Sequence, residues 1–167
     1  MRGKKVAIGG TFDPLHDGHK RLLQKAFELS EGCGSGSGSG GEIVIGVTSD
    51  RMARASKKRD VLHYEARVEK IKRYMYERYG NRIKLGIVEL NNRYGSTLDD
   101  EFDYIVISPE TYRVALKINE LRIARGKKPI KIVKVAYMTA VDGKIISSTR
   151  INAGKIDENG FLLGSKI

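Results

Sequence analysis

The chain has no tryptophan, a single cysteine and only three prolines. One cysteine cannot form an internal disulfide, which excludes a disulfide-stabilised secreted scaffold and favours a reducing cytoplasm. No apolar run approaches the roughly 20 residues that cross a bilayer, so no membrane-spanning helix is expected. The basic first residues precede only a short apolar stretch, which is typical of a buried first strand rather than a signal peptide.

The composition is that of a globular protein. Its 167 residues are 40% hydrophobic, enough for one domain with a real core. Lysine and arginine total 31 against 20 aspartates and glutamates, which gives a formal net charge of +11. Such a charge predicts anionic partners, which include nucleic acid, an acidic surface and phosphorylated small molecules. Charge alone does not choose between them.

Apolar periodicity predicts alternating strands and helices. Short buried strands are expected at 4–9, 43–48, 83–89, 104–107 and 130–135. Helical spacing occurs around Leu22 to Phe27, over 64–79 and over 111–125, while the polar segment 49–60 is predicted to be a loop. This alternation predicts an α/β fold, a Rossmann-like doubly wound parallel sheet of about five strands in one domain. Ligands of such sheets bind at the carboxyl ends of the strands.

Residues 32–41, GCGSGSGSGG, do not fit this pattern. Alternating Gly and Ser are typical of a flexible linker, and helix-to-strand connections normally need about 2–6 residues. We interpret the segment as an engineered linker insertion, with a natural low-complexity loop as the alternative. Cys33 lies in it, and no feature of the sequence suggests a base that would activate this thiol.

A group of phosphate-binding residue types follows the first strand, at 9–19, GGTFDPLHDGH. The glycines, including Gly10, allow close approach of a ligand to the backbone, and Thr11 adds a hydroxyl. His16 and His19 are three residues apart where a helix begins, so both imidazoles can face the same phosphate. Glycines after a strand are weak evidence alone, but the whole combination is specific.

The same two histidines could in principle bind a metal. A zinc site needs at least a third ligand, and the only other histidine is His63, with no cysteine cluster in the sequence. We therefore predict no protein-bound metal centre.

A second hydroxyl-rich segment lies at 145–150, IISSTR. Ser147, Ser148 and Thr149, followed by Arg150, could cap a helix and bind phosphate at once. An ordinary capped helix start is the alternative. Both segments are expected at strand-to-helix turns, which share one edge of a doubly wound sheet, so they can converge on one ligand.

Together these segments resemble the nucleotidyltransferase superfamily that carries H-x-G-H and I-S-S-T motifs. TSDRMAR at 48–54 and ISPET at 107–111 narrow the resemblance to the archaeal phosphopantetheine adenylyltransferases. The resemblance covers nearly all of the chain apart from 32–41. It implies that ATP and 4′-phosphopantetheine give dephospho-coenzyme A and pyrophosphate, by direct attack of the acceptor phosphate on the α-phosphorus.

The resemblance also implies roles for individual residues. His19 is expected to stabilise the α-phosphate in the transition state, and Mg²⁺ is expected with ATP, bound mainly through phosphates. The residues expected to hold ATP are Gly10, Thr11, Phe12, His16 and His19, with Ser147, Ser148 and Thr149 on the β- and γ-phosphates and Arg150 nearby.

Two further segments carry expectations. Within the basic stretch 49–60, Lys57 or Lys58 is expected to grip the acceptor phosphate, although a merely solvated loop is as plausible. Ser108 and Glu110 follow a predicted strand at the same sheet edge, so contacts to adenine or ribose are expected there.

Other functions stay open at this point. The nearest is adenylyl or cytidylyl transfer to another acceptor, such as nicotinamide mononucleotide, FMN or glycerol phosphate. A nucleic-acid-binding protein is disfavoured, because the sequence has no RNP-like strand, zinc finger or arginine-rich tail. A scaffold inactivated by the linker is a third possibility. We expect a monomer or small homo-oligomer.

Overall fold

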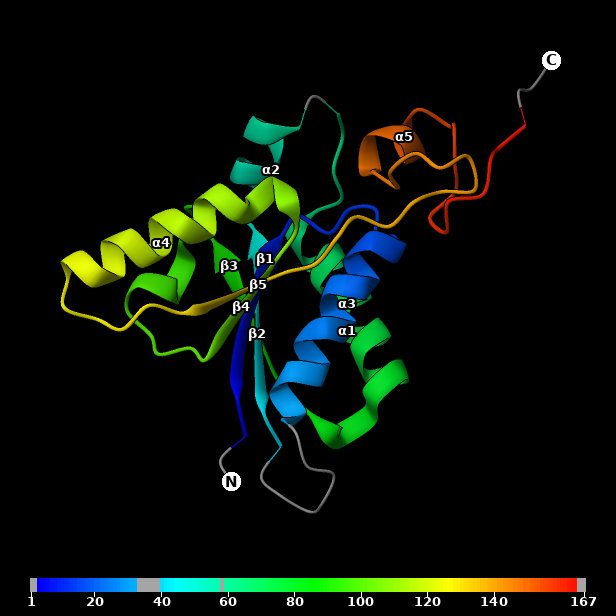
Figure 1. Ribbon diagram of the computed structural model, residues 1–167. Coiled ribbons are helices and arrows are strands. Elements are labelled where there is room, and N and C mark those ends of the chain that lie inside the picture. Colours follow the sequence, from blue (N-terminus) through cyan, green and yellow to red (C-terminus); the bar gives the residue numbers. More distant parts are fainter. Residues whose placement is uncertain (1–2, 33–39, 58, 165–167) are drawn as a thin grey trace.

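The computed structural model describes residues 3–32, 40–57 and 59–164. One parallel sheet runs through its centre in the order β3-β2-β1-β4-β5 (Figure 1). The strands are β1 (Lys5–Gly10), β2 (Glu42–Thr48), β3 (Lys84–Leu90), β4 (Tyr104–Ile107) and β5 (Lys131–Lys134). The helices are α1 (Asp17–Glu31), α2 (Asp50–Ser56), α3 (Tyr64–Tyr79), α4 (Tyr112–Ala124) and α5 (Ser148–Asn152). The prediction of a single α/β domain with a doubly wound parallel sheet is confirmed.

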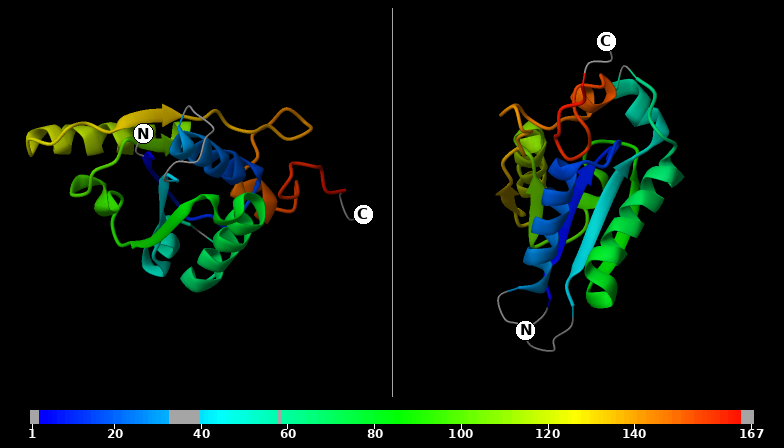
Figure 2. Two further views of the ribbon diagram at one scale, coloured as in Figure 1. Left: turned by 90° about the horizontal axis from the view of Figure 1, so that it is seen from below. Right: turned by 90° about the vertical axis from the view of Figure 1, so that its right-hand side faces the viewer.

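The strand order reverses beside β1. This strand pairs with β2 on one side and with β4 on the other, so successive strands are added on one side up to β3 and on the other side up to β5. Helices α1 and α3 cover one face of the sheet and α4 covers the other (Figures 1 and 2). A crevice therefore opens where the chain leaves β1 and β4 toward opposite faces, and ligands of doubly wound sheets bind in such a crevice.

The alternation of side chains along each strand builds two cores. In β1, Val6 and Ile8 join Leu23 of α1 and Ile71 of α3 in the larger core. Ala7 points the other way, into a second core that α4 completes with Ala115 and Ile118 among others.

The prediction of a loop over 49–60 is wrong for its first half, which forms α2. Ser49 is the N-cap of this helix, and its hydroxyl accepts from the backbone N–H of Met52. Asp50 occupies the first turn, where the helix dipole favours an acid, and Ala53 is buried. A short helix with one buried side chain has little apolar periodicity, so the charge-rich composition concealed it.

Residues 138–164 lie beyond the sheet and pack at its carboxyl edge (Figure 1). The backbone N–H of Asp17 donates to the carbonyl of Glu158 at 3.0 Å, and the Asn159 amide donates to the Asp17 carboxylate at 3.0 Å. Helix α5 follows an isolated bridge between Thr139 and Ile145. The prediction of a strand-to-helix turn at 145–150 is therefore wrong: the last sheet strand, β5, ends at Lys134, and only the isolated bridge directly precedes α5 in the described chain. The contacts to Asp17 dock the segment instead.

Three predictions from the sequence fall wholly or partly outside the described residues: those on Lys58, on Cys33 and on the Gly/Ser segment, which is undescribed over 33–39. The interpretation of that segment as an engineered insertion stays a prediction. No helix in the described ranges combines the length and apolarity that crossing a membrane requires.

Candidate active site

Two histidines cap the helix that begins beside β1, and the imidazole of each accepts a hydrogen bond from the backbone N–H of the other. His16 is the N-cap of α1; its Nδ1 accepts from the backbone N–H of His19 at 3.3 Å. The Nδ1 of His19 accepts in return from the backbone N–H of His16 at 3.3 Å, and the two rings stack with centroids 3.8 Å apart. An imidazole nitrogen that accepts carries no hydrogen, so each neutral ring carries its proton on Nε2. Both histidines therefore offer an Nε2–H donor in a fixed orientation.

The same pair is held neutral. Burial lowers the pKa of His16 to about 4, with the charge of Lys57 adding to the effect and Asp17 opposing it. Burial also lowers the pKa of His19 to about 3; His16 and Lys57 add to this effect, and the backbone carbonyl of Pro14 opposes it. Near pH 7 these imidazoles donate hydrogen bonds without carrying a positive charge.

The loop from β1 to α1 is tightly packed and leaves little space for larger side chains. A Cβ at Gly18 would lie 2.8 Å from Cε1 of His16, which explains the glycine between the histidines. Phe12 has a φ of +55°, which is strained for a non-glycine residue, and its ring is only 1% exposed. A contact of Phe12 with ATP would therefore come from its backbone, because its side chain belongs to the core.

The positive charge of Lys57 contributes to the lowered pKa of both imidazoles, so this predicted residue lies within electrostatic range of the histidine pair. The segment that follows it is pinned to the β1–α1 loop. The Asp13 carboxylate accepts from the backbone N–H of Leu62 at 2.8 Å and lies 3.6 Å from Nη1 of Arg59. Asp13 thus holds the basic segment in place as well as shaping its own turn.

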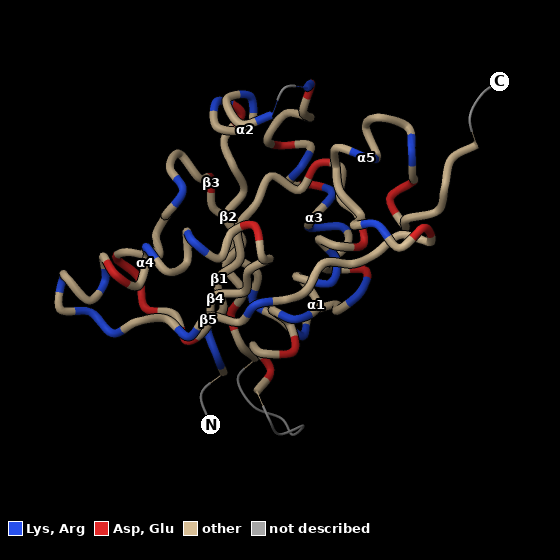
Figure 3. The backbone as a smooth tube through the Cα atoms, turned by 45° about the horizontal axis from the view of Figure 1, so that its top comes forward, with Lys and Arg blue, Asp and Glu red and all other residues tan. Residues whose placement is uncertain are grey.

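The basic charge as a whole has no single centre. Lysines and arginines are spread along the entire backbone trace (Figure 3). This distribution agrees with local phosphate contacts better than with one continuous surface for nucleic acid.

The I-S-S-T segment lies next to the histidine loop. The carbonyl oxygen of Ile146 would be 3.9 Å from a Cβ placed at Gly18, so two segments far apart in sequence meet there. The Ser147 hydroxyl caps α5 by accepting from the backbone N–H of Arg150 at 3.3 Å. The Arg150 guanidinium donates to the carbonyl of Ile145 and pairs with Asp142. Arg150 is thus held against its own turn, and Ser148 and Thr149 open the helix.

The turn after β4 faces the same region. Glu110 shares an open hollow with Ser147 and Arg150, and Tyr137 and Lys144 also line it. Ser108 precedes the short 3-10 turn Pro109–Thr111 and accepts there through its backbone carbonyl. The predicted residues therefore form two neighbouring groups, one around the histidine pair and one around the start of α5.

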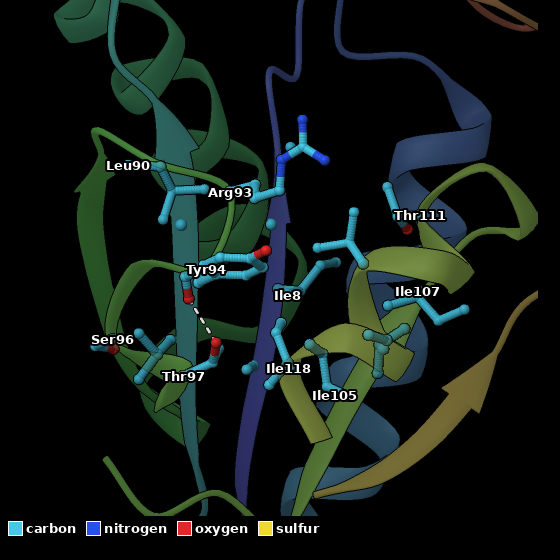
Figure 4. Close-up of a pocket in the computed structure, with 18 of the residues that line it drawn as sticks. Ile8, Leu90, Arg93, Tyr94, Ser96, Thr97, Ile105, Ile107, Thr111 and Ile118 are labelled. Carbon is cyan, nitrogen blue, oxygen red and sulfur yellow. Dashed lines mark hydrogen bonds between the residues drawn. The ribbon is translucent and has the colours of Figure 1, made fainter. Parts of the chain in front are cut away.

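An apolar pocket of about 190 Å³ opens on the α4 face of the sheet (Figure 4). Its walls come from β1, β2, β3 with the segment after it, β4 and α4. The hydroxyl of Thr97 donates to the carbonyl of Tyr94 in that segment, beside the Tyr94 ring. The backbone of Gly10 and the side chain of Thr111 also line it, so the pocket reaches the edge where the histidine loop begins.

Sequence interpretation missed three residues of this region. Arg93 lines the pocket and has no ion pair or hydrogen bond within the described part of the chain. Thr48 donates to the Thr11 hydroxyl at 3.1 Å, and Arg67 is fully buried beside them. A cation directly after β3 was a usable signal for Arg93, because strand ends share one edge. Nothing in the local sequence distinguishes Arg67 from the surface arginines.

The described residues contain no group of three or more histidine, cysteine, aspartate or glutamate side chains arranged to hold a metal. No protein ligand set for a metal is assigned.

Comparison with known proteins agrees with this geometry. The sequence profile of the cytidylyltransferase-like family matches residues 7–154, which places the chain in that class of nucleotidyltransferase folds. The phosphopantetheine adenylyltransferase of Archaeoglobus fulgidus is 52% identical over 95% of this chain and 99% of its own. That of Methanosarcina acetivorans is 47% identical over 93% of this chain and 94% of its own.

A solved structure is similar as well. The crystal structure of a protein of unknown function from Archaeoglobus fulgidus superposes with a TM-score of 0.67 at 50% identity, over 80% of this chain and 98% of that one. On these identities and coverages, the chain belongs to the phosphopantetheine adenylyltransferase family.

Proposed function

We propose that the protein transfers the adenylyl group of ATP to 4′-phosphopantetheine, giving dephospho-coenzyme A and pyrophosphate. The observation that carries this proposal is the neutral, reciprocally capped histidine pair at the reversal of strand order, on the loop that leaves β1 where Gly10 lines an apolar pocket. The names of the relatives at 47–52% identity support the choice of acceptor.

The nucleotide occupies the side of the histidine pair in this proposal. A phosphate oxygen of the acceptor attacks the α-phosphorus of ATP, the bond from that phosphorus to the bridging oxygen breaks, and pyrophosphate leaves. The Nε2–H of His19 and that of His16 donate to phosphate oxygens as negative charge builds in the transition state. Ser147, Ser148 and Thr149 bind the β- and γ-phosphates. No side chain becomes covalently modified.

The acceptor occupies the α4 face of the sheet, on the other side from the histidine pair. Its pantetheine arm fits the apolar pocket, whose lining includes Tyr94 and Ile118. Its phosphate must then lie at the edge where Gly10 lines the pocket. Lys57 and Arg93 are the cations that hold the phosphate there. Ser108 and Glu110, at the neighbouring turn, contact the adenosine.

Mg²⁺ accompanies ATP in this proposal. The described residues offer no ligand cage for it, and magnesium commonly binds through substrate phosphates with several waters retained. The single cysteine supports a reducing compartment, the cytoplasm, as the place of action.

The test offers ATP or CTP with each of four acceptors: 4′-phosphopantetheine, nicotinamide mononucleotide, FMN and glycerol phosphate. Mass spectrometry then identifies the products. We expect dephospho-coenzyme A from ATP and phosphopantetheine. Its absence, with product from another acceptor, would overturn the substrate assignment and keep nucleotidyl transfer.

A further inference from the structure

One arginine of α3 lies where four segments of the site region meet. Arg67 is fully buried, and its Nε donates to the carbonyl of Leu62 at 2.8 Å. Its Nη1 donates to the carbonyl of Thr11 and to the hydroxyl of Thr48, both at 3.2 Å. Its Nη2 donates to the Asp50 carboxylate at 3.0 Å. One guanidinium thus joins the ends of β1 and β2, the start of α2 and the segment after it.

The charge of this arginine is balanced locally. Partial burial works against ionisation of Asp50, but hydrogen bonds from Arg67 and His63 outweigh it and hold the pKa of this carboxyl below its usual value. The pair therefore stays ionised at neutral pH. A buried guanidinium with four acceptors keeps a defined geometry, because its planar fork cannot rotate one bond without losing another.

The donors and acceptors from Arg67 to Thr11 can be assigned in order. A guanidinium only donates, so the Thr48 hydroxyl accepts from Arg67. A hydroxyl polarised in this way is the stronger donor, and Thr48 gives its one hydrogen to Thr11 Oγ1 at 3.1 Å. The hydroxyl hydrogen of Thr11 is then left for an acceptor outside this chain of bonds.

We infer that Arg67 is a positioning residue that acts through Thr48: it fixes the backbone of Thr11 and turns the Thr11 hydroxyl into a donor for a phosphate of the nucleotide. This inference rests on the proposed function for the identity of the ligand. The contacts to Arg67 and Thr48 stand independently of it.

A second buried arginine provides a matched control. Arg122 is also fully buried, and it donates to the backbone carbonyls of Thr97, Asp100 and Lys128 and to the Glu101 carboxylate. It lies in the last turn of α4, and none of these acceptors belongs to the histidine loop. Replacing Arg122 reports the cost of removing a buried guanidinium without touching Thr11.

The first experiment changes the relay, by which we mean the chain of hydrogen bonds from Arg67 through the Thr48 hydroxyl to the Thr11 hydroxyl, and leaves both arginines in place. Thr48→Val keeps the side-chain shape and removes the hydroxyl, and Thr48→Ser keeps the hydroxyl. We expect Thr48→Val to lower kcat/KM for ATP about tenfold, as expected for the loss of one well-oriented hydrogen bond. Thr48→Ser should restore the ATP value.

Binding without turnover separates this inference from the proposed function. Titration calorimetry with α,β-methylene-ATP and Mg²⁺ measures nucleotide affinity with no acceptor present. Weaker binding by Thr48→Val, together with restored binding by Thr48→Ser, supports the relay even if wild type makes no dephospho-coenzyme A. Unchanged binding and unchanged kcat/KM in Thr48→Val would overturn the relay even if wild type makes that product.

Arg67→Lys and Arg122→Lys complete the test, since each keeps a positive charge and loses the fork. Both should lower Tm, but only Arg67→Lys should weaken binding of the analogue. A double-mutant cycle of Thr48→Val with Thr11→Val should be strongly non-additive, because Thr48 acts through Thr11. Additive losses in the cycle, or equal losses of nucleotide affinity in both lysine variants, would contradict the positioning role.

Discussion

The two faces of the sheet are built differently. On the α1 and α3 face, sixteen buried residues of the described chain form one continuous core, and Leu23, Ile45 and Ile71 are fully buried in it. On the α4 face, the core within the described ranges consists of seven buried residues, and a pocket of about 190 Å³ remains beside them. The histidine pair belongs to α1 on the packed face, whereas Arg93 and Tyr94 line the open one.

This difference indicates that the two faces have different roles in the proposed reaction. Phosphoryl transfer needs donors held still, and a helix anchored in a dense core keeps the orientation of His16 and His19. An acceptor with a long organic arm needs space, which the face covered by α4 provides. Variants of the packed face should therefore change stability or kcat, and variants of the open face should change the KM of the acceptor.

The largest expected effect comes from His19. Glutamine at this N3 position of the helix still reaches back to the N-cap backbone, so His19→Gln keeps the capping box and removes the imidazole. We expect His19→Gln to lower kcat by about 10²–10³, the usual loss for one donor to the transition state. His19→Ala should lose the same activity and, in addition, about 1 kcal/mol of stability with the cap. Steady-state kinetics with urea unfolding measures both, and near-normal kcat in His19→Gln would contradict the assignment.

Two buried alanines test the two faces directly. Ala26 of α1 is fully buried in the packed core, and Ala115 of α4 is 1% exposed and lines the pocket. Ala26→Leu should overpack its core and cost about 1–3 kcal/mol. Ala115→Leu should place its added atoms in the pocket, cost less, and raise the KM of the acceptor while the KM of ATP stays unchanged.

Urea unfolding and steady-state kinetics on both alanine variants make the measurement. Equal destabilisation, with no change in acceptor KM for Ala115→Leu, would show that the pocket is not an acceptor site.

The pH dependence of stability tests the burial of the histidine pair. The folded pKa values, about 4 for His16 and about 3 for His19, lie below the unperturbed histidine value of 6.5. The unfolded chain therefore binds more protons than the folded one below pH 6.5, and stability is lost as pH falls from 6.5 toward these values. Two such groups should cost on the order of 2 kcal/mol between pH 6.5 and 5.5.

Urea unfolding of wild type and of a His16→Gln, His19→Gln double variant over that pH range gives the comparison. The variant should show a flatter dependence on pH. Parallel curves would mean that these imidazoles titrate normally in the folded protein.

The smallest effect is expected at Arg93. Arg93→Ala should raise the KM of the acceptor about tenfold, as expected for one charge-assisted hydrogen bond to phosphate, and leave the KM of ATP unchanged. Arg51→Ala is the matched control, because Arg51 is exposed in α2, donates to the carbonyl of Asn91 and does not line the pocket. Equal changes in both variants would indicate a general effect of charge rather than a contact.

Local patterns in the sequence predicted most of the fold. The helix over 64–79 and the strand over 104–107 agree with the structure to the residue, because their periodicity spans the whole element. Helix α2 was missed, since its signals are a cap and one buried alanine. The site residues near the histidines were proposed from motif composition, and their assignment to ATP stays a prediction.

Local sequence was enough to predict the alternation of strands and helices, the glycine and histidine loop after β1, and the membership of a nucleotidyltransferase family. These follow from neighbouring residues, where period, capping and backbone freedom act within a few positions. The contact of Arg67 with Thr11, 56 positions away in the sequence, becomes visible only in the folded chain. Likewise, only the packing of α4 against the sheet decided which face keeps a pocket, because that depends on how distant surfaces fill space.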